Sequence, residues 1–180
     1  MPDIEFAILD FIQDNFRNDF SNFIMPIISA LGNKGIIWII TGLRLCISKK
    51  YRKSGIIILT ALVFSALLCN LTLKPLVARM RPFTVNSEIK LLINAPADFS
   101  FPSGHTASSF SVAFALLFNK NRLWIPSMIL AVLIAFSRLY LYVHYPTDVL
   151  CGIIIGLIIG FISNIICKIL FEKFSQKTHI

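Results

Sequence analysis

Acidic side chains are scarce in this chain, which has nine Asp and Glu residues among 180 and a charged fraction of only 14%. A site that binds two metal ions needs several ligands close together, most often carboxylates. In the long polar stretch 74–102 the acids are Glu88 and Asp98, which are too few and too far apart for such a site. We therefore expect chemistry that needs no metal ion and no other cofactor.

Cysteine is sparse as well, and its four copies lie singly within apolar stretches. They form no CxxC pair, the spacing of many metal and redox sites. We expect Cys46, Cys69, Cys151 and Cys167 to be small buried hydrophobic residues. The first residues are acidic and lack the basic segment of a secretory signal peptide, so we also expect no cleavable signal.

Apolar residues, in contrast, make up 56% of the chain. A soluble domain of this length leaves much of its surface in water and could not hide that much apolar surface. The apolar runs predict an all-α fold, a polytopic membrane bundle of about six helices that forms one domain over residues 1–180. The predicted apolar segments are 20–31, 36–48, 54–73, 104–118, 123–140 and 147–170.

Residues 3–17 differ from these segments because their apolar and polar side chains alternate at helical spacing. This pattern predicts an amphipathic helix that lies at the membrane interface. Two possibilities stay open for residues 1–35. They form either one broken span or an interfacial helix followed by a short helix.

Basic residues give the chain a net charge of +8, which in a soluble protein would suggest nucleic acid as a partner. Here they cluster between apolar segments without interleaved exposed aromatics, so we expect no nucleic-acid partner. The positive-inside rule places the basic loops 49–53 and 119–122 and the C-terminal tail in the cytoplasm. Alternation of the spans then puts 74–102 and 141–146 on the extracytoplasmic side of a plasma membrane, although 74–102 carries four basic residues itself. His179, in the tail, has no expected role.

Polar residues gather at the ends of apolar segments on that same predicted face. They occur in three stretches, KPLVARMRP at 74–82, PSGH at 102–105 and SRLYLYVHYPTD at 137–148. The candidate functional residues in these stretches are Lys74, Arg81, Ser103, Gly104, His105, Arg138, His144 and Asp148.

These residues suggest both the binding of an anion and a reaction on it. Three cations and the free N–H groups at a helix start suit a group with two or more negative charges, and phosphate is the obvious candidate. Asp148, in the first turn after Pro146, can orient His144 and leave one ring nitrogen free to attack. His105 can give a proton to a departing oxygen. Each residue alone has an ordinary role as a topology anchor, helix cap or hydrogen-bond partner, and only their convergence favours phosphoryl transfer.

In these three stretches the chain resembles the membrane members of the type 2 phosphatidic acid phosphatase (PAP2) superfamily. The signature of that family is K-x6-RP, PSGH and SR-x5-H-x3-D, and the chain matches every position of it. The resemblance implies a metal-independent hydrolase with a core of six helices. It also implies that His144 is the nucleophile that forms a phosphohistidine, that Asp148 orients this histidine, and that His105 is the general acid. The residues implied to hold the phosphate are Lys74, Arg81, Ser103, Gly104 and Arg138.

The sequence therefore favours hydrolysis of a membrane lipid phosphate or diphosphate, with the bilayer and the lipid as the only expected partners. Undecaprenyl diphosphate is the preferred substrate, and phosphatidylglycerol phosphate and phosphatidate are the alternatives, because the signature holds the phosphate and does not contact the lipid tail. A transporter would carry polar residues near the middle of its spans, whereas here they lie at span ends. A haloperoxidase of the same superfamily would be soluble. Arg79, outside the signature, is expected to contact anionic lipid headgroups, with the site entrance as the alternative.

Overall fold

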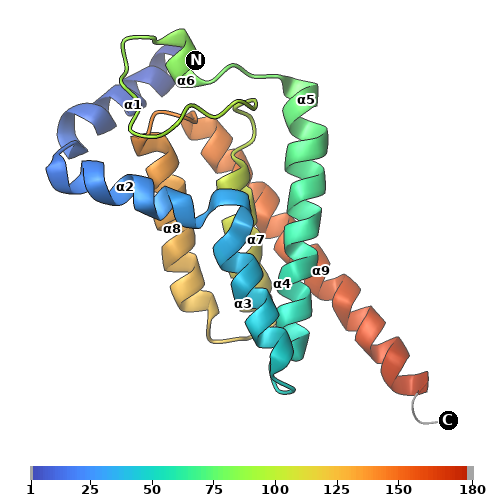
Figure 1. The fold of residues 1–180 in the computed structure, drawn as a ribbon. Helices are drawn as coiled ribbons and strands as arrows, with labels where there is room; N and C mark the ends of the chain where they lie inside the picture. Colours follow the sequence, from blue (N-terminus) through green and yellow to red (C-terminus); the bar gives the residue numbers. More distant parts are fainter. Residues whose placement is uncertain (1, 178–180) are drawn as a thin grey trace.

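The computed structural model describes residues 2–177, which fold into a bundle of helices (Figure 1). His179 lies outside the described residues. The described elements are α1 (Pro2–Phe16), α2 (Asp19–Leu31), η1 (Asn33–Gly35), α3 (Ile36–Ile47), α4 (Arg52–Ser65), η2 (Ala66–Leu73), α5 (Lys74–Val77), α6 (Pro82–Val85), α7 (Gly104–Phe118), α8 (Trp124–Tyr140) and α9 (Pro146–Lys177).

Within residues 2–177, two helical stretches are long and apolar enough to cross a membrane, Arg52–Val85 and Pro146–Lys173. The pair α2 and α3 would add a third span, bent by 46° at η1, and α7 and α8 are shorter apolar helices. In Figure 1 the turns before α4 and before α8 lie at one end of the bundle together with the end of α9, whereas the α6–α7 connection and the α8–α9 corner lie at the other. The predicted grouping of loops at two ends is therefore observed.

The N-terminal residues form two separate helices that lie across one end of the bundle (Figure 1). Helix α2 begins with a capping box, in which Asn18 and Ser21 each accept a hydrogen bond from the other's backbone N–H. The apolar face of α1 packs on the α8–α9 corner, where Leu9 contacts Tyr142 and Tyr145. The amphipathic helix predicted for 3–17 thus buries part of its apolar face against protein, while Ile4 stays exposed.

Small residues bring α7 and α9 into close contact, as the Ala- and Ser-rich composition of α7 allows. Gly152, Gly156 and Gly160 stand one turn apart on α9, and a Cβ at Gly156 would lie 2.7 Å from the Cβ of Phe110. This close approach joins the start of α7 to the start of α9, where the Ser103 N–H donates to the Asp148 carbonyl at 3.1 Å.

The helix that begins at Arg52 extends beyond the predicted boundary at residue 73. It widens into the π-helical turn η2, in which the Lys74 N–H donates to the Cys69 carbonyl five residues earlier, and it continues as α5 to Val77. The stretch predicted as a loop from residue 74 therefore begins with helix and contains the short α6 as well. Lys74 projects from the end of a long helix, and π-helical turns are frequent at functional sites.

Candidate active site

The three polar stretches meet at a cavity of about 560 Å³ at the end of the bundle beneath α2 and the α6–α7 connection. Five of the eight predicted site residues line it, namely Lys74, Arg81, His105, Arg138 and His144. The cavity is also lined by Asn33 and Asp98, which the sequence did not single out as site residues. The five predicted residues, separated by up to 70 positions in the chain, thus share one polar space.

His144 lies deep in this site, with 1% of its surface exposed. Its Nδ1 is 3.5 Å from Asp148 Oδ2, and its Nε2 is 3.3 Å from Arg81 Nη1. The Asp148 contact is longer than an ordinary hydrogen bond. Burial lowers the pKa of His144 well below its usual value, and the charges of Arg81, Arg138 and Lys74 add to that effect. The ring is therefore neutral near pH 7, with Nε2 facing the cations.

Asp148 is fully buried at the start of α9, and its carboxylate is fixed by several donors. Oδ2 accepts hydrogen bonds from the Ser100 hydroxyl at 2.5 Å and from the Tyr145 N–H at 2.9 Å. The preceding residues turn sharply through Tyr142, whose φ is 58°, and Pro146 then begins α9. This turn places His144 and Asp148 on one side of the corner, as their four-residue spacing predicts.

Lys74 and Arg81 both bind the carboxylate of Asp98. The Lys74 ammonium contacts Oδ2, and Arg81 Nη2 is 2.7 Å from Oδ1. Burial works against ionisation of Asp98, but hydrogen bonds and charge from Lys74 and Arg81 outweigh it and lower its pKa to about 2. Asp98 therefore holds a negative charge where the two cations can also bind a phosphate.

Arg138 is the third cation and has only 3% of its surface exposed. One of its terminal nitrogens donates to the Ser29 hydroxyl. Among the described residues, its Nε has no hydrogen-bond partner. A buried donor without a partner is costly, so the cavity is suited to an anion that would supply an acceptor.

His105 lies in the first turn of α7 and is less buried than His144. Its Nε2 is 2.9 Å from Asn33 Oδ1 in the turn between α2 and α3. Gly32 approaches the ring so closely that a Cβ there would lie 2.7 Å from His105 Cδ2. The break between α2 and α3 thus fixes the position of His105.

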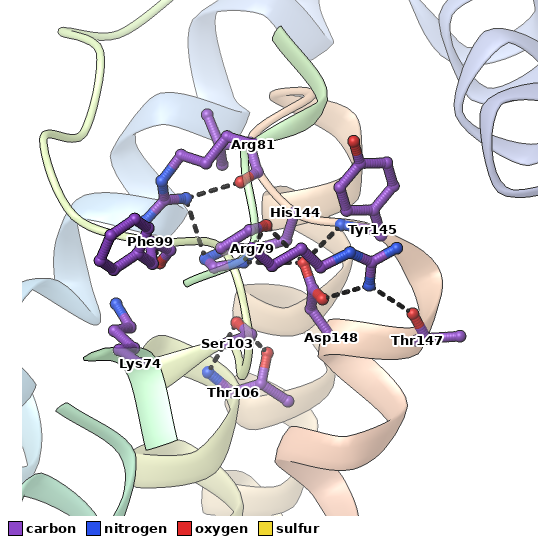
Figure 2. Close-up of polar contacts among 12 residues, drawn as sticks. Lys74, Arg79, Arg81, Phe99, Ser103, Thr106, His144, Tyr145, Thr147 and Asp148 are labelled. Carbon is purple, nitrogen blue, oxygen red and sulfur yellow. Dashed lines mark hydrogen bonds and ion pairs between the residues drawn. The ribbon is translucent and has the colours of Figure 1, made fainter. Parts of the chain in front are cut away.

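The remaining predicted residues of the PSGH stretch have different positions. Ser103 is fully buried and does not line the cavity, and its hydroxyl contacts Thr106 Oγ1 at 2.8 Å and caps α7 (Figure 2). Gly104 lines an adjoining cavity, and a Cβ there would lie 3.0 Å from Asn70 Oδ1. The structure supports the capping role of Ser103, while a phosphate contact by its hydroxyl stays a prediction.

The prediction for Arg79 is wrong. Its guanidinium turns inward, with Nη1 2.6 Å from Asp148 Oδ1 and 2.7 Å from Thr147 Oγ1 (Figure 2). Its other terminal nitrogen is 2.5 Å from Glu5 Oε2 on α1. A side chain held by these acids is not free to bind lipid headgroups.

The family model of the PAP2 superfamily matches residues 54–170, which include all three signature stretches. The chain belongs to the PAP2 superfamily. The chain is similar to the crystal structure of a transmembrane PAP2-type phosphatidylglycerolphosphate phosphatase from Bacillus subtilis. The two structures superpose with a TM-score of 0.73 at 27% identity, and the superposition covers 98% of this chain and 86% of that one. This similarity confirms the predicted all-α membrane bundle.

Two curated relatives indicate the range of activities within this superfamily. An undecaprenyl-diphosphatase of Sulfolobus acidocaldarius is 36% identical over 132 residues, which are 73% of this chain and 63% of the relative. A lipid A 4'-phosphatase of Bacteroides thetaiotaomicron is 39% identical over 101 residues, 52% of this chain and 45% of the relative. The PAP2 chain thus spans less than two thirds of the length of these relatives.

Proposed function

We propose that this PAP2 protein hydrolyses a membrane lipid phosphate or diphosphate through a phosphohistidine at His144. One observation carries the proposal, namely that two histidines and three cations line a single cavity. Phosphoryl transfer needs an in-line nucleophile, neutralised phosphate oxygens and a protonated leaving group. Each of these needs has a matching side chain in the cavity.

In the first step, Nε2 of His144 attacks phosphorus while the bond to the leaving oxygen breaks. Lys74, Arg81 and Arg138 neutralise the phosphate oxygens, and the free N–H groups of the first turn of α7 supply further donors. His105 gives its proton to the leaving oxygen, so that an alcohol or a lipid monophosphate departs. In the second step, His105 takes a proton from water, which attacks the phosphohistidine and releases inorganic phosphate with His144 restored.

A second cavity of about 880 Å³ adjoins the first and supports a lipid as the substrate. The two share Asn33, Lys74, Asp98 and His105. Away from these residues, the walls of the second cavity are mostly apolar and come from α3, α4 and the start of η2, with Ile36, Ile39, Leu59, Leu62, Val63 and Ala66 among the lining residues. A lipid chain in this space would place its phosphate beside His105, which suits the role of a general acid for a lipid leaving group.

Undecaprenyl diphosphate is the proposed substrate. The described residues that line the cavity include three cations, Lys74, Arg81 and Arg138, and one acid, Asp98, so the lining has an excess of positive charge. A diphosphate carries enough negative charge to balance that excess. The name of the Sulfolobus relative supports the same class. Phosphatidylglycerol phosphate, supported by the name of the Bacillus neighbour, and phosphatidate are the second candidates. We place the cavity on the extracytoplasmic face of the plasma membrane, since the basic turns lie at the opposite end.

A substrate panel tests this function. Phosphate release from undecaprenyl diphosphate, phosphatidylglycerol phosphate and phosphatidate is measured with the purified protein in detergent, with a chelator and with His144→Ala as the matched control. We expect fastest release from the diphosphate, unchanged turnover with chelator, and no release by the variant. Turnover that the chelator abolishes would refute the metal-free mechanism, and fastest release from another lipid would reassign the substrate.

A further inference from the structure

The carboxylate of Asp148 has two distinct sides. Oδ2 accepts from Ser100 and the Tyr145 N–H and lies near His144, whereas Oδ1 is bound by Arg79 Nη1 at 2.6 Å. Asp148 is completely buried, and a buried carboxylate is costly unless it is paired and hydrogen-bonded. Arg79 supplies the paired charge and also determines which carboxylate oxygen faces the histidine.

Arg79 is itself held from several directions. Its guanidinium carbon lies 3.8 Å from the centre of the Tyr145 ring, and Nη2 is 2.5 Å from Glu5 Oε2. The other oxygen of Glu5 accepts from the Thr147 hydroxyl at 2.5 Å, next to Asp148 in the first turn of α9. Stacking combined with fixed carboxylate contacts suits the planar fork of an arginine. Figure 2 shows the Arg79 side chain reaching across to Thr147 and Asp148.

We propose that Arg79, held by Glu5 of α1, is a positioning residue that orients Asp148 and, through it, the nucleophile His144. The inference rests on the proposed function, because it concerns the same histidine. It extends the site beyond the signature, since Glu5 lies outside the matched residues 54–170 and 142 positions away from Thr147. Helix α1 then serves the reaction as well as the packing of the α8–α9 corner.

The arrangement predicts a specific kinetic effect. Arg79 is not among the residues that line the cavity, so its loss leaves the phosphate contacts of Lys74, Arg81 and Arg138 in place. A misoriented Asp148 would lower the reactivity of His144 without weakening substrate binding. Residues that orient a reactive group from behind commonly contribute about 10- to 100-fold, as is documented for the outer partners of metal ligands.

The test compares Arg79→Ala, Arg79→Lys and Glu5→Gln in the purified full-length protein, with the lipid phosphate that the panel shows to be hydrolysed fastest. We expect kcat to fall about 10- to 100-fold in Arg79→Ala with KM changed by no more than about twofold. Added guanidinium ion should restore part of kcat in that variant alone, Arg79→Lys should retain an intermediate kcat, and Glu5→Gln should show a smaller loss. The control is Arg17→Ala, because Arg17 connects the end of α1 to the Lys90 carbonyl without touching Asp148.

A raised KM with unchanged kcat would overturn the inference in favour of substrate or headgroup contact. Unchanged kinetics in Arg79→Ala would overturn it as well. If Arg79→Ala fails to fold, as judged by its thermal unfolding in detergent, Glu5→Gln carries the test, and a normal kcat there contradicts the positioning role. His144→Ala, measured in parallel, separates the two proposals. Turnover retained by His144→Ala refutes the proposed function, whereas an inactive His144→Ala beside a normal Arg79→Ala refutes only this inference.

Discussion

The two histidines of the cavity differ in how they are held. His144 is buried between Asp148, Ser100 and Arg81, and the acid beside it is fixed by several donors of its own. His105 is only partly buried, and among the described residues its ring makes one hydrogen bond, to Asn33, beside the close approach of Gly32. It lines both cavities, whereas His144 lines only the first. This difference suits the proposed roles, because a nucleophile such as His144 must be held in a fixed position, whereas a proton donor such as His105 must lie beside the departing lipid.

Replacing each histidine in turn tests this contrast with the largest expected effect. His144→Ala should abolish turnover while lipid binding survives, because no phosphohistidine can form. His105→Ala should lose roughly 10²- to 10⁴-fold in kcat, the usual contribution of a general acid. Initial rates and a binding measurement in detergent check both expectations.

An aryl phosphate with a good leaving group sharpens the comparison. Such a substrate needs no proton on its departing oxygen. The rate of the first step, phosphohistidine formation, should therefore recover mostly in His105→Ala, while His144→Ala should stay inactive. Equal recovery in both variants, or in neither, would contradict the assigned roles. If the two assignments are reversed, His144→Ala is the variant that recovers.

The surroundings of His144 also predict the pH profile. We expect kcat/KM to be bell-shaped, because one histidine must be neutral and the other protonated. Burial and the charges of Arg81, Arg138 and Lys74 lower the pKa of His144 well below its ordinary value, so the ring gains a proton only in acid. The acid limb should therefore lie well below about pH 6.5.

Lys74→Met tests the cause of that shift. Removing the Lys74 charge raises the pKa of His144, so the acid limb should move to higher pH by up to about one unit. The variant should also bind phosphate more weakly. The profile of kcat/KM between about pH 4 and 9 measures the shift. An acid limb near the ordinary histidine value in the unmodified protein would contradict the neutral, pre-set nucleophile.

The site has two parts, one around the buried His144 and one around the more exposed His105 and Asp98. These parts differ in how far the sequence predicts them. Lys74, Arg138 and His144 could be located because apolar runs place their stretches at span ends and fixed spacings place them near helix boundaries. Asp98 belongs to a stretch without periodicity, and its pairing with Lys74 depends on how the α6–α7 connection folds back over the cavity. No local pattern encodes such a contact.

The same reasoning applies to the N-terminal helix. Helical spacing predicts that one face of residues 3–17 is apolar, but it does not predict whether lipid or protein covers that face. Here Leu9 and Ile12 pack on the α8–α9 corner, and Glu5 contacts Arg79 across more than 70 positions. Long-range pairings of single polar residues are specified by the whole fold, which is why the sequence does not predict the contacts of Arg79.

Replacement of Asp98 has the smallest predicted effect and tests the part of the site around Asp98 and His105 most directly. Its charged carboxylate occupies donors of Lys74 and Arg81 that a phosphate would also use, so the two anions compete. Because more than half of the Asp98 side chain is exposed, solvent screens this competition. Asp98→Asn should therefore lower the inhibition constant of inorganic phosphate by about fivefold, the effect of about 1 kcal/mol, with little change in kcat. Glu88→Gln, an equal charge change at an exposed position of the same connection, is the matched control and should change nothing. Weaker inhibition by phosphate in Asp98→Asn would mean that Asp98 holds Lys74 and Arg81 in place for substrate. The part of the site around Asp98 and His105 would then be as firmly organised as the part around His144.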